Sequence, residues 1–208
     1  MALDSTQPLV MLSPVQRLLK RSFDLSLSLC LMPCLLVPFL FFLILMTCSL
    51  NRWAWFSQTR IGQYGRPFTL YKLRTLKGAH HKLGSEGQST TNLGAWLRKT
   101  HIDEWPQVFN ILIGDMSFVG PRPDLPGYAD QLQGEDRLIL EVKPGLTGPA
   151  SLKYRTETGI LQNQKNPESY YRAVIWPDKV QMNKNYVKSY RFSLDLQLLL
   201  KTLVHVFN

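Results

Sequence analysis

Residues 25–50 read LSLSLCLMPCLLVPFLFFLILMTCSL and contain no charged side chain. A helix of this length and composition is about long enough to cross the hydrocarbon core of a bilayer. The apolar run is too long for a signal peptide, 24 residues precede it, and no small-residue cleavage motif follows it. The run therefore predicts a helix that is embedded in a membrane.

Two prolines interrupt this run, and basic residues lie on both sides of it. Pro33 and Pro38 each remove a backbone donor and crowd the preceding turn, so we expect the helix to bend. Positive side chains favour the cytoplasmic face, and a bent helix that enters and leaves by that face would satisfy both flanks. The residues alone leave this re-entrant form and a simple span equally open. The basic residues are Arg17, Lys20 and Arg21 before the run, and Arg52, Arg60, Arg66, Lys72 and Arg74 after it.

The stretch before the apolar run has the features of a helix start. Ser13 is a typical N-cap, and Pro14 suits the first helical position. Apolar side chains between Val15 and Phe23 then share one face, and the basic side chains share another. This pattern predicts an interfacial helix that leads into the bilayer, with an ordinary amphipathic surface helix as the alternative.

The composition fits one folded domain with an anionic partner. The 208 residues are 45% hydrophobic and 19% charged, which is not the composition of a disordered chain. The net charge of +9 suits nucleic acid, acidic lipid head groups or a phosphorylated substrate. Cys30, Cys34 and Cys48 lie in the apolar run without a CxxC pair, and so indicate neither a disulfide framework nor a zinc site.

Residues 51–208 are expected to form a compact cytoplasmic domain, preceded by the interfacial and membrane helices of residues 1–50. Residues 60–75, RIGQYGRPFTLYKLRT, alternate around two glycines and predict a β-hairpin. Residues 80–91 are polar and contain several Gly, Ser and Thr, which predicts a mobile loop. Its histidines, His80 and His81, have no further ligand pattern nearby and are expected to be solvated.

The rest of this domain is expected to be built from short amphipathic helices. One helix is expected at residues 93–99, and a strongly apolar helix at 194–207 would pack on the core or against the membrane. Pro/Gly turns are expected at residues 120–123 and 143–148. The predicted fold class is therefore α/β but mostly α, with one re-entrant helix and one short hairpin.

Two adjacent carboxylates, Asp103 and Glu104, lie close to a predicted helix start. Pro106 is tolerated only in the first turn of a helix, so Asp103 is the expected N-cap of a helix that Gly114 ends. The positive end of the helix dipole would keep both carboxylates ionised, as a nucleophile or a magnesium ligand requires. The alternative is that Asp103 only caps the helix and Glu104 only favours its first turn.

Several cations lie in or beside the same segments. Arginine is suited to bidentate contact with phosphate, although any single cation is by default part of a solvated face. Two carboxylates, several cations and a membrane segment together suit phosphoryl transfer on a lipid phosphate. The absence of a Walker loop, a GxGxxG after a strand and an HExxH motif argues against P-loop, dinucleotide and zincin enzymes. The cations are Lys72, Arg74, Arg98, Lys99 and Arg122.

Taken in order, these segments resemble the small bacterial sugar transferases, the monotopic phosphoglycosyl transferases. The resemblance covers nearly the whole chain from Lys20 onward and is strongest where a DE-x-PQ motif is followed by GDMSxVGPRP. The matching segments are KRSFD (20–24), QTRIG (58–62), PFTLYKLRT (67–75), LRKTHIDEWPQVFN (97–110), GDMSFVGPRP (114–123), PGLTG (144–148) and SLDL (193–196).

The resemblance implies a phosphoglycosyl transferase on the cytoplasmic face of the bacterial inner membrane, with both ends of its re-entrant helix in the cytoplasm. The implied reaction moves a sugar 1-phosphate from a UDP-sugar to undecaprenyl phosphate. The products are a polyprenyl-diphosphate sugar and UMP, formed by a covalent ping-pong mechanism as the first membrane step of glycan assembly. The resemblance also implies Mg²⁺ as cofactor.

The same resemblance implies roles for particular residues. Asp103 corresponds to the nucleophile and Glu104 to the carboxylate near the metal, so both are expected at Mg²⁺. The PRP arginine, Arg122, is expected at the nucleotide or its phosphates. The implied substrate-binding residues are Lys72, Arg98, Pro121, Arg122 and Pro123.

Some positions depart from the family pattern. Asn183 stands where many relatives have Asp, so any catalytic role of that Asp is in doubt here. A membrane-anchored protein that binds anionic lipid or nucleic acid remains the rival hypothesis, in which Asp103 would be dispensable. The enzyme hypothesis expects inner-membrane lipids and the two substrates as partners and no nucleic acid. The sequence leaves the sugar, the glycan pathway and the oligomeric state open, including a homodimer.

Overall fold

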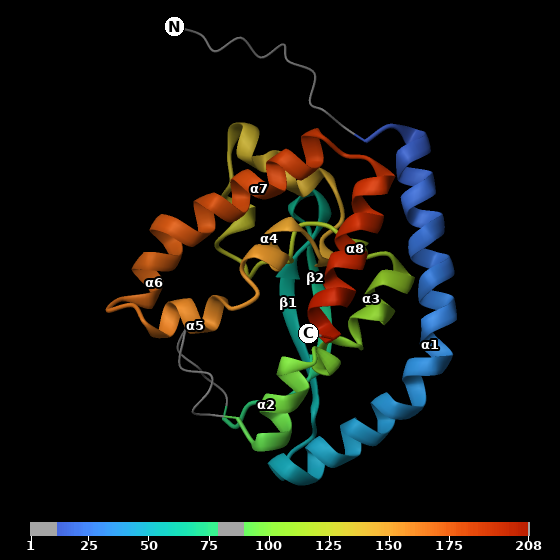
Figure 1. Cartoon of the computed structure of the whole chain (residues 1–208), viewed down its shortest axis with the longest axis vertical. Coiled ribbons are helices and arrows are strands. Elements are labelled where there is room, and N and C mark those ends of the chain that lie inside the picture. Colours follow the sequence, from blue (N-terminus) through green and yellow to red (C-terminus); the bar gives the residue numbers. More distant parts are fainter. Residues whose placement is uncertain (1–11, 79–89, 208) are drawn as a thin grey trace, which may run out of the picture.

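The computed structural model describes residues 12–78 and 90–207, most of which are helical. The predicted mostly α fold with a small hairpin is confirmed (Figure 1). The loop expected at residues 80–91 lies almost entirely outside the described residues, and so do His80 and His81.

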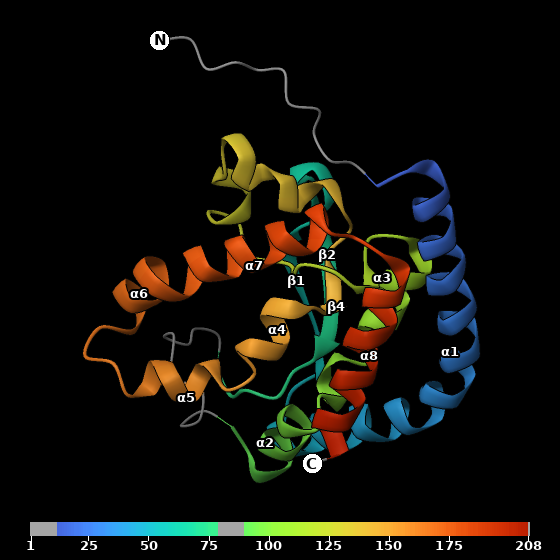
Figure 2. The ribbon, with the colours of Figure 1, turned by 45° about the horizontal axis from the view of Figure 1, so that its top comes forward.

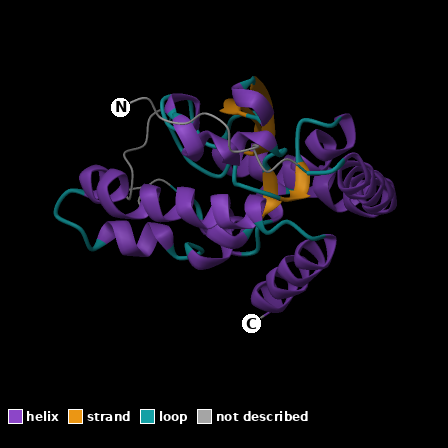
Figure 3. Cartoon of the chain, turned by 90° about the horizontal axis from the view of Figure 1, so that it is seen from above, coloured by secondary structure: helices purple, strands orange, loops and turns teal. Residues whose placement is uncertain are grey.

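The strands form two small sheets among helices of very different length. An antiparallel hairpin pairs β1 with β2, and a short parallel pair joins β3 to β4. Seen from above, the strands lie between the long first helix and the group of helices from the C-terminal half (Figure 3). In chain order the main elements are α1 (Pro14–Leu50), β1 (Trp55–Ile61), β2 (Pro67–Leu73), α2 (Asn92–Lys99), α3 (Gln107–Ile113), β3 (Ser117–Val119), β4 (Gly145–Thr147), α4 (Pro149–Lys153), α5 (Glu157–Gln162), α6 (Pro167–Tyr170), α7 (Trp176–Lys188) and α8 (Phe192–Phe207).

Short 3₁₀ or π-helical segments connect several of these elements. Most are 3₁₀ turns, and one π-helical turn joins α6 directly to α7. The turns are η1 (Gln63–Gly65), η3 (Ile102–Glu104), η4 (Ala129–Gln131), η5 (Gly134–Glu141) and the π turn η6 (Tyr171–Ile175).

The helix α1 begins and bends as the sequence predicts. Ser13 caps it, with its hydroxyl accepting from the Gln16 backbone N–H and the Gln16 side chain accepting from the Ser13 N–H. Pro33 and Pro38 both lie inside the 37-residue helix. The ribbon runs down one edge of the molecule and then turns beneath it (Figures 1 and 2). The helix α1 is long enough and apolar enough to cross a bilayer. This property supports membrane association of the protein.

The first half of α1 is held to the domain by three polar side chains. The Lys20 ammonium donates to the Asp195 carboxylate at the start of α8, at 2.6 Å. The Arg21 guanidinium donates to the carbonyls of Ile111 and Leu112 at the end of α3, at 2.7 and 2.8 Å. Asp24 accepts from the Ser117 hydroxyl and the Phe118 backbone N–H at the start of β3, both at 3.1 Å. The basic flank of the helix is therefore partly a docking surface, besides any role at a lipid interface.

The second half of α1 packs on the same domain through apolar contacts. Leu43 and Met46 are buried against Leu73 of β2 and Leu97 of α2. Both ends of the helix thus contact one compact unit, while much of its outer face stays exposed. The exposed apolar residues of α1 are Val15, Leu18, Leu19, Leu29, Leu36, Val37, Leu40, Phe41, Ile44 and Leu45.

The hairpin is fixed to α3 by one buried amide. Asn110 is fully buried, and its side-chain N–H₂ donates to the carbonyl of Thr69 at 2.7 Å. Its side-chain oxygen accepts from the backbone N–H of Tyr71 at 3.2 Å. Both bonds go to backbone groups of β2, so the side chain satisfies them as a neighbouring strand would. Gly114, with φ of +102°, ends α3 as predicted.

The parallel pair β3–β4 depends on glycines that let two backbones come unusually close. A Cβ on Gly120 would lie 2.4 Å from the Lys143 carbonyl oxygen, and one on Gly145 would lie 2.1 Å from the Gly120 nitrogen. No real Cβ fits at these distances. The predicted Pro/Gly turns at residues 120–123 and 143–148 are therefore parts of one close contact.

We predict that Asp195→Ala costs about 3–5 kcal/mol of unfolding free energy, since it leaves the buried Lys20 ammonium unpaired. It also removes the acceptor of the Tyr186 and Tyr190 hydroxyls. Lys20→Met combined with Asp195→Leu should cost less than Asp195→Ala alone, because neither member of the pair is left buried without the other. Thermal unfolding of the unmodified protein and of both variants, in the same detergent, would measure these differences in stability.

The matched control is the exposed pair between Arg172 and Glu168. Glu168→Gln should change stability by less than about 1 kcal/mol, as exposed ion pairs do. Equal losses from Asp195→Ala and Glu168→Gln would contradict the assignment of Lys20–Asp195 as the tie between α1 and α8.

Candidate active site

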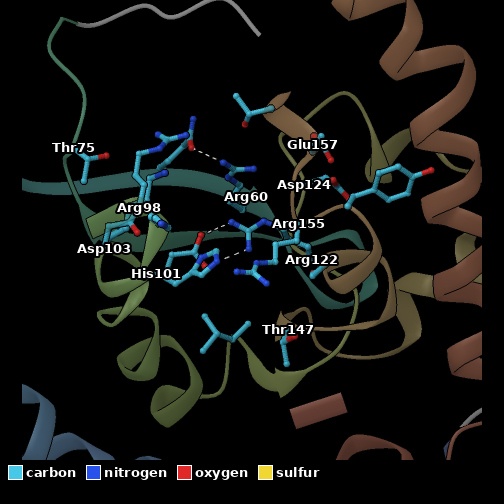
Figure 4. A pocket seen from close by; sticks show the side chains of 18 of the residues that line it. Arg60, Thr75, Arg98, His101, Asp103, Arg122, Asp124, Thr147, Arg155 and Glu157 are labelled. Atoms are coloured by element: carbon cyan, nitrogen blue, oxygen red, sulfur yellow. Dashed lines mark hydrogen bonds and ion pairs between the residues drawn. The ribbon is translucent and has the colours of Figure 1, made fainter. Parts of the chain in front are cut away.

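A cavity of about 930 Å³ opens at the centre of the domain. Its walls include the hairpin, the loop after β3, and the helices α4, α5 and α7. They also include the turn η3, which carries the adjacent carboxylates Asp103 and Glu104, here called the dyad. Figure 4 shows Arg122 in the middle, with Asp103 and Arg98 on one side and Asp124 and Glu157 on the other. The volume lies in the range of small-molecule sites.

The dyad lies on a tight turn and does not cap a helix. His101 adopts a left-handed conformation, with φ of +56°, and a 3₁₀ turn over Ile102–Glu104 follows it. The helix α3 begins only at Gln107, with Pro106 as its N-cap. The prediction that Asp103 is the N-cap is therefore wrong, because the chain reverses at His101 and reaches the helix through this turn. The turn places both carboxylates at the cavity wall.

Glu104 is held by Arg122, which follows β3. The two Nη groups of Arg122 donate to the two carboxylate oxygens, Nη1 to Oε2 at 3.3 Å and Nη2 to Oε1 at a shorter distance. Burial alone would raise the pKa of Glu104, but the charge and hydrogen bonds of Arg122 lower this pKa to about 2. Glu104 is therefore ionised at every physiological pH.

Asp103 is in a different electrostatic environment from its neighbour. Burial, followed by the charge of Glu104, raises the pKa of Asp103 to about 6, although Lys72, Arg98 and Arg122 oppose the rise. A helix dipole does not lower this pKa as expected, because Asp103 lies on a 3₁₀ turn before α3 and its burial raises the pKa. At neutral pH the carboxylate is still mostly ionised, and it is more basic than an exposed aspartate.

The hairpin contributes cations to the same cavity. Burial lowers the pKa of Lys72, while Asp103 and Glu104 oppose the shift. Arg60 also lines the cavity, and burial followed by the charge of Arg122 lowers its pKa to about 10. Its guanidinium donates to the Pro123 carbonyl at 3.2 Å and to Gln58 at 2.8 Å.

Of the predicted site residues, five line one cavity and two do not. Lys72, Arg98, Asp103, Glu104 and Arg122 all belong to its wall. Pro121 and Pro123 are not among its lining residues. Their carbonyls accept from the Gly145 backbone N–H at 2.8 Å and from Arg60 at 3.2 Å, respectively. The prolines therefore shape the loop that carries Arg122.

Sequence reasoning missed the wall opposite the dyad. Burial raises the pKa of Asp124 to about 7, against the charges of Lys179 and Arg60, and Lys179 forms an ion pair with Glu157. Only Asp124 had a local signal, since it directly follows the PRP motif. The charged and titratable lining residues that were missed include Arg60, His101, Asp124, Arg155, Glu157 and Lys179.

The dyad fits a hard divalent cation that keeps most of its water. Among residues 12–78 and 90–207, no group of three or more His, Cys, Asp or Glu side chains could hold a metal ion. Mg²⁺ commonly uses one or two carboxylates and completes its shell with waters and substrate phosphates. Each Glu104 oxygen that accepts from Arg122 retains a second lone pair for such an ion.

Comparison with known proteins places the chain among enzymes of one kind. It is 35% identical over 188 residues to the sugar transferase EpsL of Bacillus subtilis, covering 89% of this chain and 85% of that protein. It is 31% identical over 207 residues to the UDP-glucose:undecaprenyl-phosphate glucose-1-phosphate transferase of Escherichia coli, covering 94% of this chain and 42% of that protein.

A third relative is the UDP-N-acetylgalactosamine-undecaprenyl-phosphate N-acetylgalactosaminephosphotransferase of Aeromonas hydrophila, 27% identical over 199 residues. That match covers 92% of this chain and 44% of the relative, so the chain spans less than half of the two relatives whose names state a reaction. The model of the family described as "Bacterial sugar transferase" matches residues 15–208. The chain therefore belongs to the bacterial sugar transferase family.

Proposed function

We propose that this protein transfers a sugar 1-phosphate from a UDP-sugar to undecaprenyl phosphate and releases UMP. The relatives' names supply the reaction class. The observation that carries the proposal is the pair of adjacent carboxylates in one cavity, with Glu104 bound by Arg122 and Asp103 left more basic. Carboxylates whose environments separate their pKa values in this way cluster at catalytic sites.

The proposed reaction has two displacements at one phosphorus atom. A carboxylate oxygen of Asp103 attacks the phosphorus that carries the sugar, and the bond to the UMP oxygen breaks with its electron pair. A phosphate oxygen of undecaprenyl phosphate then attacks the same phosphorus, and Asp103 leaves as a carboxylate. One site thus serves a soluble donor and a lipid acceptor in turn.

The cations of the cavity would stabilise the charge that builds up on the phosphoryl oxygens. Arg122 uses two Nη groups on Glu104 and still has further N–H donors. Lys72 and Arg98 lie in the same wall and interact electrostatically with Asp103. The substrate-binding roles of these three residues are part of the proposal.

Mg²⁺ is the proposed cofactor, held by Glu104 and Asp103. When bound, the ion would neutralise charge on the diphosphate and on the departing nucleotide. The chain's own contribution is to keep Glu104 ionised through Arg122 and to hold both carboxylates on one short turn.

We further propose that α1 is re-entrant and holds the domain at the cytoplasmic face of the inner membrane, where it would begin glycan assembly. Lys20, Arg21 and Asp24 in its first half and Leu43 and Met46 in its second half contact one domain. A straight span would separate the two halves by about 30 Å of hydrocarbon. The exposed apolar residues between them support immersion of the bend.

The first prediction of this proposal is that Asp103 carries the phosphosugar covalently. Purified protein is mixed with each of a panel of UDP-sugars without acceptor, and intact-protein mass spectrometry should detect a phosphosugar adduct on Asp103. Asp103→Asn should form no adduct and should lose turnover by at least about 1,000-fold. Adduct formation should weaken below about pH 6, because protonation of Asp103 removes the nucleophile.

Asp115→Asn is the matched control. Asp115 lies just after the other end of α3 and does not line the cavity. It should form the adduct as the unmodified protein does. Substantial turnover by Asp103→Asn would exclude the covalent mechanism, and so would kinetics that require both substrates bound together.

The second prediction concerns the metal ion. UMP release should stop in excess EDTA and return when Mg²⁺ is added beyond the chelator, because the ion offsets charge on the leaving nucleotide. Glu104→Gln should need a higher Mg²⁺ concentration and remain slow at saturation, since it loses a ligand charge. Full activity in excess chelator would remove the proposed metal role of both carboxylates.

The third prediction concerns topology. In a variant without the native cysteines, Arg17→Cys and Asn51→Cys should both resist an impermeant maleimide in intact cells and react after lysis. Replacing Pro33 and Pro38 with Leu should straighten the helix and expose one flank to the periplasm. Labelling of either single-cysteine variant in intact cells would contradict the re-entrant form.

A further inference from the structure

Buried polar atoms without partners gather in the cavity wall. Five side-chain polar atoms in the described part of the chain are buried without a hydrogen-bond partner, and four of them belong to residues that line this cavity. A buried donor or acceptor without a partner is unfavourable, and such atoms are rare in native proteins. Their concentration in the residues of one cavity wall is consistent with a ligand that supplies the missing partners once these side chains turn toward it. The four are Arg60 Nε, Arg74 Nε, Ser151 Oγ and Asn183 Oδ1.

These four atoms divide the cavity into two chemical regions. The Arg60 and Arg74 atoms are cationic and come from the hairpin side, on the β1 strand and just after β2. The Ser151 and Asn183 atoms are neutral and come from α4 and α7, which pack against each other (Figure 2). The hairpin region suits anionic groups, whereas the α4–α7 wall suits neutral polar groups.

The α4–α7 wall combines hydrogen-bonding groups with aromatic surface. Trp176, Lys179 and Asn183 of α7 all line the cavity, and their spacing places them on one face of the helix. Tyr154 also lines it and is held by a hydrogen bond from its hydroxyl to Asp178 at 2.8 Å. A sugar ring presents apolar faces with polar hydroxyl groups along its edge. A wall that combines aromatic side chains with hydrogen-bonding groups is complementary to such a surface.

The polar atoms of this wall suit a ligand that carries hydrogen-bond donors. Asp124 and Glu157 line the same part of the cavity, and Lys179 already pairs with Glu157. The Asn183 side-chain oxygen is an acceptor, so its partner on the ligand must be a donor. Hydroxyl groups meet that requirement.

The proposed reaction also requires a sugar site here. The phosphorus attacked by Asp103 carries the sugar through a single oxygen, so the sugar must lie in the same cavity as the dyad. In Figure 4 Arg122 separates the Asp103 side from the Asp124 and Glu157 side. A phosphate bound at Arg122 would therefore leave its sugar within reach of the α4–α7 wall.

We propose that Ser151 and Asn183 form the sugar-recognition subsite, each exchanging a hydrogen bond with a hydroxyl group of a neutral hexose on the donor. This inference rests on the proposed function and extends it, because it assigns donor selectivity to two residues outside the dyad. Neither residue acts on the phosphorus, so both are specificity determinants.

The test uses Ser151→Ala and Asn183→Leu in the full chain. Since neither polar atom has a partner in the free protein, both variants should keep or raise the ligand-free melting temperature. Each should lower kcat/KM for the preferred UDP-hexose by roughly three- to tenfold, the loss of one neutral hydrogen bond. The preference for that donor over its epimers should narrow, while the inhibition constant of UMP, which lacks the sugar, should stay the same.

Asn185→Leu is the matched control, because Asn185 is an exposed residue of the same helix outside the cavity wall. It should change none of these quantities. Unchanged kcat/KM and unchanged donor preference in both test variants would overturn the subsite. A lower ligand-free melting temperature together with weaker UMP binding would also overturn it, since that pattern indicates a structural role. Absence of UMP release by the unmodified protein with every donor would instead refute the proposed function itself.

Discussion

The arrangement of this protein depends on how the first half of α1 is docked. Lys20, Arg21 and Asp24 lie on little more than one helical turn, yet they bind three elements that are distant in sequence. Arg21 fixes the end of α3, whose start follows the dyad turn, and Asp24 fixes β3, which leads into the Arg122 loop. The helix that carries the apolar bend therefore contacts both of the elements that lie next in the chain to Glu104 and Arg122, and the ion pair depends on the distance between these two residues.

That distance determines the chemistry that the dyad can perform. Arg122 is close enough to bind Glu104 through both oxygens, and it holds the pKa of Glu104 at about 2. The ionised Glu104 and the burial of Asp103 together raise the pKa of Asp103 to about 6. Two neighbouring carboxylates thus acquire different properties, one a permanent anion and the other a more basic group. This separation does not need a helix dipole.

The sequence allowed prediction of features that depend on neighbouring residues. The Ser13 cap and the Gly114 helix end follow from local rules and are confirmed. The hairpin predicted at residues 60–75 is confirmed in its turn and second strand, but its first strand begins earlier, at Trp55. The Asp103 cap is wrong because the left-handed His101 starts a turn that no local pattern indicates. The Lys20–Asp195 pair joins residues 175 positions apart, and the wall formed by α4 and α7 depends on similar long-range packing, so neither could be predicted from spacing alone.

The cavity's position is compatible with the two substrates of opposite solubility that the proposed function requires. Thr147 of β4 and Thr202 of α8 line it and bond to each other at 2.7 Å, so the cavity reaches the helix that packs against α1. Its wall from α5 lies on the opposite side of the domain from the first half of α1 (Figure 1). A donor entering from the aqueous side and a lipid phosphate entering beside α1 would meet the same carboxylate. In the proposed reaction the second substrate must reach the phosphorus that the first has delivered, and a covalent intermediate on Asp103 would remove the need for both to occupy the cavity together.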